Sequence, residues 1–339
     1  MKRFILVLFI MFTVVSFSQV IKGKVVDENN LPLTGANIYF DGTTIATITD
    51  ANGNFSLNYT SKINSILAIS YIGFQTEYIT NIVVGKELLI KLIQSNTSIN
   101  EIIIRKDKFS RKQKLQLFRE QFLGKTSNAK ATKIENEDAI YFDYNSKTKT
   151  LKAYSDQPLL IKNTALGYKL TYELVNFEVV FSRETMMSSE VVRSYYAGLS
   201  RFGDTTIDTR TQKKREKAYQ GSQLHFFRNL VNKIWNKDNF LLFNGSYLDN
   251  PYDYFNVFDE GDTKKVTIER QVKPFFNKNF VAEFNLLFNR KQQSRITFET
   301  DTFYVDKFGN NSNIENIIFS GYLSQLKVGD MLPINYGIK

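Results

Sequence analysis

His225 is the one histidine of this chain, and the chain has no cysteine. A thiolate nucleophile is therefore excluded, and a zinc site would need several carboxylates beside this imidazole. Ser222 lies three residues before His225, but no HExxH or GxSxG spacing accompanies the pair. We predict a hydrogen-bonded histidine on a helix surface or at a domain seam, and no catalytic, cofactor-binding or metal residue.

Oxygen-bearing side chains alternate at Asp50, Asn52 and Asn54 around Gly53, a spacing typical of a short calcium loop. One carboxylate alone is present, and no bidentate Glu follows at the required distance. Asn and Asp tolerate the left-handed conformation and Gly53 supplies positive φ, so we interpret the stretch as a turn.

Two acidic clusters could supply the carboxylate pair of a glycoside hydrolase. They are Glu135, Glu137 and Asp138, and Asp259, Glu260 and Asp262. Both lie in polar segments, where a solvated turn is the simpler interpretation. The aromatic stretch 247–255, YLDNPYDYF, suits either sugar stacking or packing against a neighbouring strand.

A basic run precedes and enters a predicted amphipathic helix over residues 108–123. Its members are Arg105, Lys106, Lys108, Arg111, Lys112 and Lys114. Such a run could contact anionic headgroups peripherally, although a solvated linker is the simpler interpretation. Leu115, Phe118 and Phe122 share the apolar face of the helix, and Gly124 is expected to end it.

The first 18 residues have the charge and apolar pattern of a secretory signal peptide, with cleavage expected before Gln19. Export would leave no ordinary nucleic-acid partner. Removing Lys2 and Arg3 takes the formal charge from +10 to +8, which can favour polyanions.

Alternation with period two predicts a β-meander over residues 32–57, with turns at Gly42 and Gly53. GANI at 35–38, GTT at 42–44, TD at 49–50 with Gly53 and Phe55, and ISYIGF at 69–74 resemble the carboxypeptidase-like regulatory domain over residues 20–92. The resemblance implies a transthyretin-like (prealbumin-like) seven-stranded β-sandwich, common in Bacteroidota envelope proteins, without peptidase activity. Within it, residues 66–72 are expected to form a strand buried on both faces.

Residues 93–124 are interpreted as a linker strand followed by the amphipathic helix. The β-branched run at 99–104 is similar to one that pairs with an energising partner in TonB-dependent transporters of this phylum. No plug or large barrel follows it here, so a linking strand is the simpler interpretation.

From residue 125 to 339 the pattern predicts a larger, mostly antiparallel β domain with one or two helices. The expected strands are 140–144, 168–174, 191–196, 266–270, 280–288, 296–300, 302–306 and 314–319. Ser222 is expected to cap a helix whose apolar face runs from Phe227 to Trp235. IKNTALGYKLTYEL, KAYQGSQLHFFRNL and GDMLPINYG resemble segments that follow such regulatory-like domains in Bacteroidota envelope proteins, without a known activity.

The sequence therefore predicts a mainly β, exported, non-enzymatic envelope protein that acts in binding or assembly, in the periplasm or at the outer membrane. Its partner would be a protein or a glycan. Two alternatives stay open: a hydrolase using carboxylates of the C-terminal domain, and a small outer-membrane β-barrel.

Overall fold

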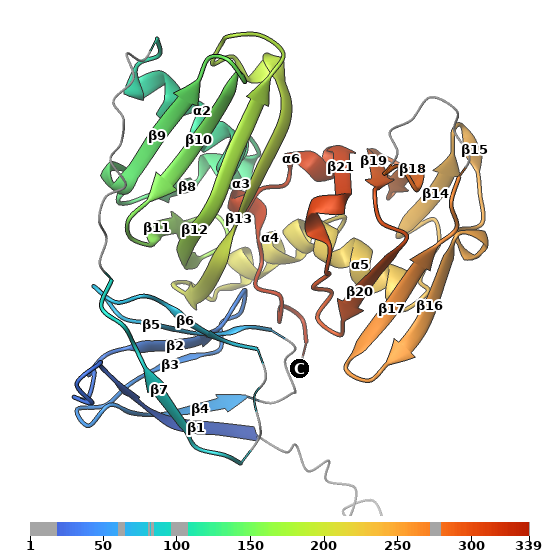
Figure 1. Cartoon of the computed structure of the whole chain (residues 1–339). Coiled ribbons are helices and arrows are strands. Elements are labelled where there is room, and N and C mark those ends of the chain that lie inside the picture. Colours follow the sequence, from blue (N-terminus) through green and yellow to red (C-terminus); the bar gives the residue numbers. More distant parts are fainter. Residues whose placement is uncertain are drawn as a thin grey trace, which may run out of the picture. The chain divides into compact units, whose positions relative to one another are not determined.

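A computed structural model describes residues 19–338 apart from 60–64, 81, 83–84, 96–107 and 272–278. The chain divides into two compact units, drawn in Figure 1. The first unit holds residues 1–40 and 45–95, and the second holds 41–44 and 96–338. The expected signal peptide and the strand at 99–104 fall outside the described residues.

The first unit is a sandwich of two small sheets, as expected. One sheet has the order β4-β1-β7, with β1 and β7 parallel, and the other is antiparallel with the order β3-β2-β5-β6. The strands are β1 (Gln19–Val26), β2 (Asn37–Phe40), β3 (Ala46–Ile48), β4 (Asn54–Tyr59), β5 (Leu67–Ser70), β6 (Glu77–Ile79) and β7 (Leu88–Lys91).

Period-two alternation builds the core of the sandwich. Phe55, Leu57 and Tyr59 of β4 are buried while the residues between them are exposed. The ring centroids of Phe40 and Tyr59 lie 5.4 Å apart in an edge-to-face arrangement. The expected fully buried strand is correct for β5 but wrong at Ile72, whose side chain is 88% exposed on the turn after it.

The second unit begins with a six-stranded antiparallel sheet centred on β12. β12 pairs with β11 and β10 along one edge and with β13 along the other. The elements are α2 (Arg111–Phe122), α3 (Ser127–Lys130), β8 (Thr132–Ile134), η1 (Glu137–Ala139), β9 (Ile140–Asn145), β10 (Thr150–Ser155), β11 (Leu159–Asn163), β12 (Tyr168–Phe181), η2 (Ser188–Glu190) and β13 (Val191–Asp204).

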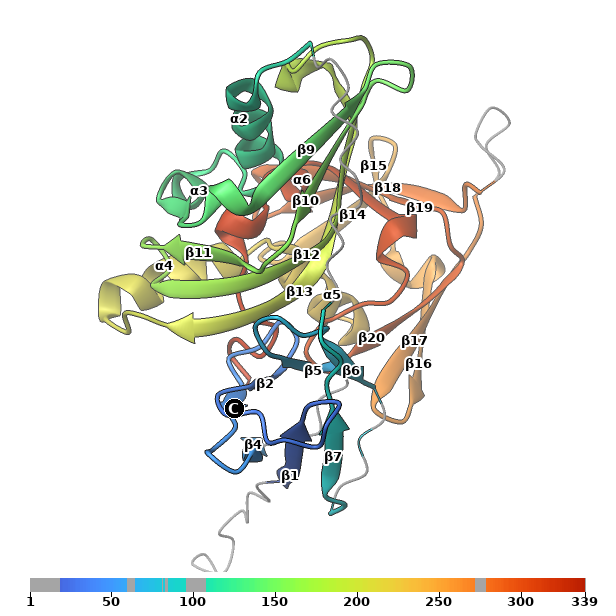
Figure 2. The same cartoon turned by 60° about the vertical axis from the view of Figure 1, so that its left-hand side comes forward.

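The helix α2 covers one face of this sheet, as Figure 2 shows. A capping box between Ser110 and Gln113 starts it, and Gly124, at φ 95°, follows its end, as predicted. The ring of Phe118 lies 4.6 Å from that of Phe177, and the ring of Phe122 lies 5.0 Å from that of Tyr172. These rings anchor the helix to β12.

Two further antiparallel sheets, ordered β15-β14-β18-β19-β21 and β16-β17-β20, share a second core with α5. The strands are β14 (Phe240–Asn244), β15 (Tyr247–Leu248), β16 (Phe255–Glu260), β17 (Thr263–Ile268), β18 (Ala282–Phe288), β19 (Gln292–Phe298), β20 (Thr302–Asp306) and β21 (Ile317–Gly321). The short helical turns are η3 (Pro251–Asp253), η4 (Ile314–Asn316), α6 (Tyr322–Gln325) and η5 (Val328–Asp330). β20 matches its predicted bounds, whereas β21 begins three residues later than predicted because η4 precedes it.

Two longer helices connect the sheets, and one of them was not predicted. α5 (Gln223–Val231) is capped by Ser222 as expected, but it ends before Ile234, which is 40% exposed. α4 (Thr209–Tyr219) is the unpredicted helix, capped by Asp208. Among the described residues, no helix has the length and apolar character needed to cross a bilayer.

Candidate functional site

His225 is a buried structural residue and not a helix-surface one. Its side chain is 5% exposed, with ring centroids 4.7 Å from Tyr219 and 5.5 Å from both Phe240 and Phe288. Nδ1 accepts a hydrogen bond from the Gly221 N–H at 3.1 Å. Burial lowers the pKa of His225 to about 4, so the imidazole is neutral at physiological pH.

Ser222 has a capping role and does not activate the imidazole. Its Oγ accepts a hydrogen bond from the backbone N–H of His225 at 3.1 Å, which is the N-cap bond of α5. The Ser-His spacing in the sequence therefore reports the start of a helix.

Members of the two acidic clusters make local ion pairs on separate elements, the turn η1 and the β16–β17 hairpin. Glu137 pairs with Arg119 of α2. Asp259 lies 2.9 Å from Lys264 and Glu260 lies 3.8 Å from Lys265 across the β16–β17 hairpin. All three pairs are partly exposed, and ion pairs of this kind contribute little to stability.

Asp50 organises a turn between β3 and β4. Its Oδ1 accepts hydrogen bonds from the N–H groups of Asn52 at 2.9 Å and Asn54 at 2.8 Å, and Gly53 has φ 77°. In the described part of the chain, no three His, Asp or Glu side chains gather where they could hold a metal ion.

The aromatic stretch 247–255 divides between surface and core. Tyr247 is 82% exposed at the tip of the β14–β15 hairpin, and Tyr252 is 52% exposed. Tyr254 turns inward and donates a hydrogen bond to Asp249 Oδ2 at 2.6 Å, and Phe255 packs 5.4 Å from the ring of Phe284. The exposed aromatic surface is therefore smaller than the sequence stretch indicates.

The predicted basic patch before α2 is broken up by contacts within the second unit. Lys108 pairs with Glu184 at 2.7 Å, Arg111 donates to the carbonyl of Ile140 at 2.7 Å, and Lys114 is buried. Lys112 stays exposed, and Arg105 and Lys106 lie outside the described residues.

Sequence reasoning missed a row of three exposed lysines across neighbouring strands. Lys162 of β11 stands directly opposite Lys133 of β8 on one side and Lys169 of β12 on the other. We call these three residues the lysine row. None of them has an ion pair or hydrogen bond to a side chain within the described ranges. Like charges placed directly opposite one another destabilise a sheet, so the row carries a cost.

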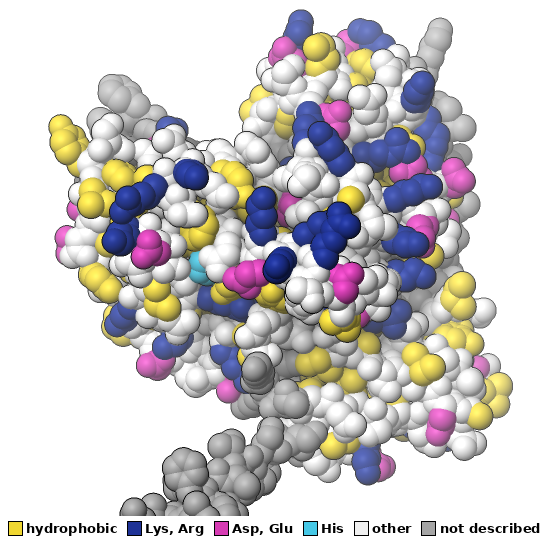
Figure 3. All heavy atoms as spheres, turned by 180° about the vertical axis from the view of Figure 1, so that it is seen from behind, with side chains coloured by type: hydrophobic (Ala, Val, Ile, Leu, Met, Phe, Trp, Pro, Cys, Tyr) yellow, Lys and Arg dark blue, Asp and Glu magenta, His cyan; other side chains and the backbone are white. Residues whose placement is uncertain are grey.

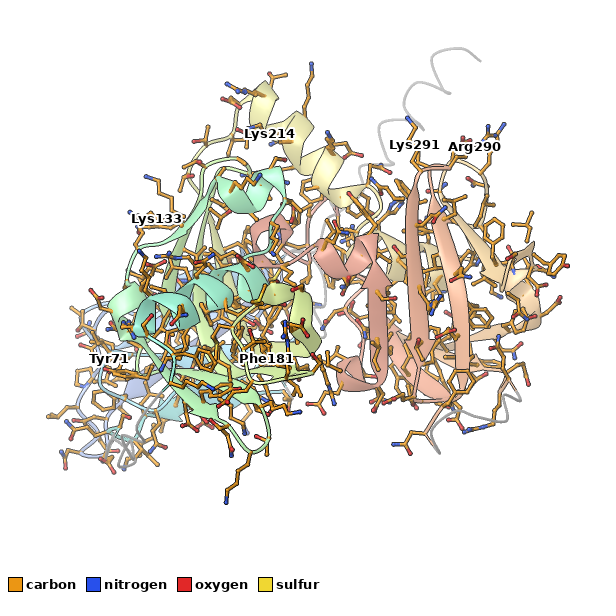
Figure 4. The ribbon with its side chains drawn as sticks, turned by 90° about the horizontal axis from the view of Figure 1, so that it is seen from above. Tyr71, Lys133, Phe181, Lys214, Arg290 and Lys291 are labelled. Atoms are coloured by element: carbon orange, nitrogen blue, oxygen red, sulfur yellow. The ribbon has the colours of Figure 1, made fainter. Side chains whose placement is uncertain are left out.

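Further exposed basic side chains lie on other elements of the second unit. Lys213, Lys214 and Lys217 lie on α4, and Arg290 and Lys291 form the tight turn between β18 and β19. Figure 3 shows Lys and Arg side chains gathered on the face seen from behind. Figure 4 shows Lys133, Lys214, Arg290 and Lys291 reaching outward from their elements. A surface of this kind attracts anions over a Debye length of about 8 to 10 Å.

Comparisons with known proteins bear on the first unit. Residues 21–104 match the family model of the CarboxypepD_reg-like domain. The TonB-dependent receptor SusC of Bacteroides thetaiotaomicron is 33% identical over 84 residues, which are 25% of this chain and 8% of the receptor. This chain therefore matches a small part of the receptor's length.

Among solved structures, a chain of a type II cohesin–X-dockerin complex from Acetivibrio cellulolyticus, an N-terminal interface mutant, shares 21% identity at a TM-score of 0.20. The match covers 22% of this chain and 58% of that one. The family match agrees with the resemblance predicted over residues 20–92 and extends it by twelve residues, to 104. The family model therefore confirms the resemblance to the CarboxypepD_reg-like domain that was predicted for the first unit.

Proposed function

We propose that this chain is an exported, non-enzymatic cell-envelope protein that binds an acidic glycan through the lysine row of its second unit. The observation that carries the proposal is the set of three lysines held directly opposite one another on β8, β11 and β12, without ion-pair partners in the described part of the chain. An anionic polymer would neutralise all three charges and relieve their mutual repulsion.

The family match supports an envelope location and a binding role. The relative that shares the first unit is a TonB-dependent receptor of a Bacteroides species. The hydrolase alternative is less well supported, because Glu137 and Asp259 of the acidic clusters considered for it make local ion pairs on different elements. A protein partner with an acidic surface is the competing outcome of the test below.

The test replaces the lysine row by glutamines in the triple variant K133Q/K162Q/K169Q. We expect binding to polygalacturonate, measured by titration calorimetry at low salt, to weaken by about 10- to 100-fold. A lysine near an anionic surface contributes about 1 kcal/mol, and 1.4 kcal/mol is a tenfold change. Raising the salt to 0.3 M should weaken wild-type binding as well, because screening shortens the range of the charges.

The matched control, K112Q/K147Q/K237Q, removes the same charge from exposed lysines outside the row. It should bind polygalacturonate like the wild type. Equal loss in both triple variants would mean that net charge alone drives binding, and dextran binding as tightly as polygalacturonate would reject the acidic glycan. If an acidic envelope protein binds and polygalacturonate does not, the partner is a protein.

A further inference from the structure

A pocket of about 280 Å³ lies within the second unit, between the start of α5, the loop after β20 and the chain from 326 to 334. Much of its lining is apolar, and Phe227 and Leu332 are the most buried of these side chains. Its size falls just below the range of sites that take drug-sized ligands, so a small molecule suits it.

Lys327 brings one positive charge into this apolar lining. Its Nζ lies 5.7 Å from the ring centroid of Tyr196 and makes no hydrogen bond or ion pair with any residue that the structure describes. The nearby carboxylate of Asp330 is bound elsewhere, to Thr126 Oγ1 at 2.7 Å and to Asn128 Nδ2 at 2.9 Å. Among the residues that the structure describes, the ammonium group therefore has no counter-ion in the pocket.

Removing an ammonium group from water is costly unless an anion accompanies it. Burial alone lowers the pKa of Lys327 to about 8, because the charged ammonium group is disfavoured away from water. A bound carboxylate would restore the missing partner and favour the charged form of the amine.

Apart from Asp330, the polar part of the lining also favours a negative group. Ser222 and Gln223, at the start of the nine-residue helix α5, line the pocket, and no acidic residue lies in its first turn. The positive end of the helix dipole therefore lies at the pocket. Asn310 and Asn311 add amide groups that can donate hydrogen bonds to an anion.

We propose that this pocket binds a small organic acid, with its carboxylate paired to Lys327 Nζ and its apolar body against Phe227 and Leu332. The site shares no residue with the lysine row, so this proposal does not depend on the proposed function and is tested separately from it. A free inorganic anion would lack the apolar half of the contact.

The test uses phenylacetate as the probe and phenylacetamide as its uncharged match, both titrated calorimetrically into the full chain. We expect phenylacetate to bind at least tenfold more tightly than phenylacetamide. K327Q should remove that difference, so that both probes bind the variant equally weakly. K307Q, which changes an exposed lysine in the loop after β20, should bind like the wild type.

Leu332→Ala provides a second, independent variant on the apolar side of the pocket. This variant should bind phenylacetate more weakly than the wild type does, but it should still bind phenylacetate more tightly than phenylacetamide. The proposal is overturned if phenylacetate fails to bind the wild type at millimolar concentration, or if both probes bind equally. It is also overturned if K327Q keeps the preference, or if inorganic phosphate binds as tightly as phenylacetate.

Discussion

Replacing Arg215 with methionine should lower the free energy of unfolding by about 3 kcal/mol. Arg215 lies on α4, and its side chain is 4% exposed. Its Nε donates to the carbonyl of Leu166 at 2.7 Å, and its Nη2 donates to that of Gly167 at 3.0 Å and pairs with Asp204 at 2.7 Å. The guanidinium carbon lies 3.7 Å from the ring centroid of Tyr168.

Methionine keeps most of the volume and the apolar contact with Tyr168, but it donates no hydrogen bond. The carbonyl of Leu166 then stays buried without the hydrogen bond from Arg215, at a cost of about 1 to 3 kcal/mol. The carbonyl of Gly167 keeps the hydrogen bond from the Thr205 N–H at 2.9 Å. Losing the cation–π contact adds about 1 kcal/mol. Asp204 is partly exposed, so water can replace its partner at little cost.

Urea unfolding followed by circular dichroism measures the effect, with Lys213→Met as the matched control. Lys213 is exposed on the same helix two residues away, so that variant should stay within about 0.5 kcal/mol of the wild type. Arg215→Lys keeps a positive charge and some hydrogen-bond donors, so its free energy of unfolding should lie between those of R215M and K213M. If the free energies of unfolding of R215M and K213M differed by less than about 1 kcal/mol, the hydrogen bonds of the buried guanidinium would not stabilise the fold as argued.

The same residue explains why α4 could not be predicted from the sequence. Helix prediction depends on apolar residues that recur every three or four positions. The buried positions of α4 are Thr211, Arg215 and Ala218, which have this spacing but include a polar and a charged residue. At Arg215 a guanidinium that donates to backbone carbonyls occupies a position where an apolar side chain would be expected. Those carbonyls come close to Arg215 only in the folded chain, so the sequence does not reveal them.

The strands were largely predictable because their alternation is local. Tyr168, Leu170 and Tyr172 alternate with polar residues in the sequence, and they are buried in the structure as expected. How far a strand extends depends on its partner: β12 continues to Phe181 because β13 pairs with it over almost its whole length.

The candidate sites depend on register and on distant segments, which one sequence does not reveal. Lys133, Lys162 and Lys169 each look like an ordinary solvated strand residue, and it is pairing across three strands that brings them together. Lys327 likewise appears as one lysine in a polar segment until α5 and the loop after β20 surround it.

The second large effect is a pH-dependent stabilisation when Asp306 is replaced by asparagine. Asp306 is 4% exposed at the end of β20. Its Oδ1 accepts hydrogen bonds from the N–H groups of Phe308 at 2.8 Å and Asn310 at 2.9 Å, whereas Oδ2 has no hydrogen-bond partner among the described residues. Burial outweighs these bonds and raises the pKa of Asp306 from 3.8 to about 6, although Arg228 acts in the opposite direction.

A raised carboxyl pKa in the folded state means that folding favours the protonated acid. Well below pH 3.8 the group is protonated in both states and costs nothing. As the pH rises from about 4 to 6, the unfolded chain loses this proton while the folded chain retains it, so stability falls. Above pH 6 the loss levels off at about 3 kcal/mol, since one pKa unit corresponds to about 1.4 kcal/mol.

Asp306→Asn preserves the Oδ1 acceptor and cannot ionise, so this loss should be absent from the variant. We expect the difference in unfolding free energy between D306N and the wild type to rise in favour of the variant by about 2.5 kcal/mol between pH 4 and pH 7.5. Urea unfolding at four pH values measures it, and comparing the two proteins cancels the other titrating groups. Asp301→Asn makes the same substitution at an exposed acid in the turn before β20 and serves as the matched control. A difference between D306N and the wild type that is constant or falls with pH would mean that Asp306 is ionised without penalty in the folded protein.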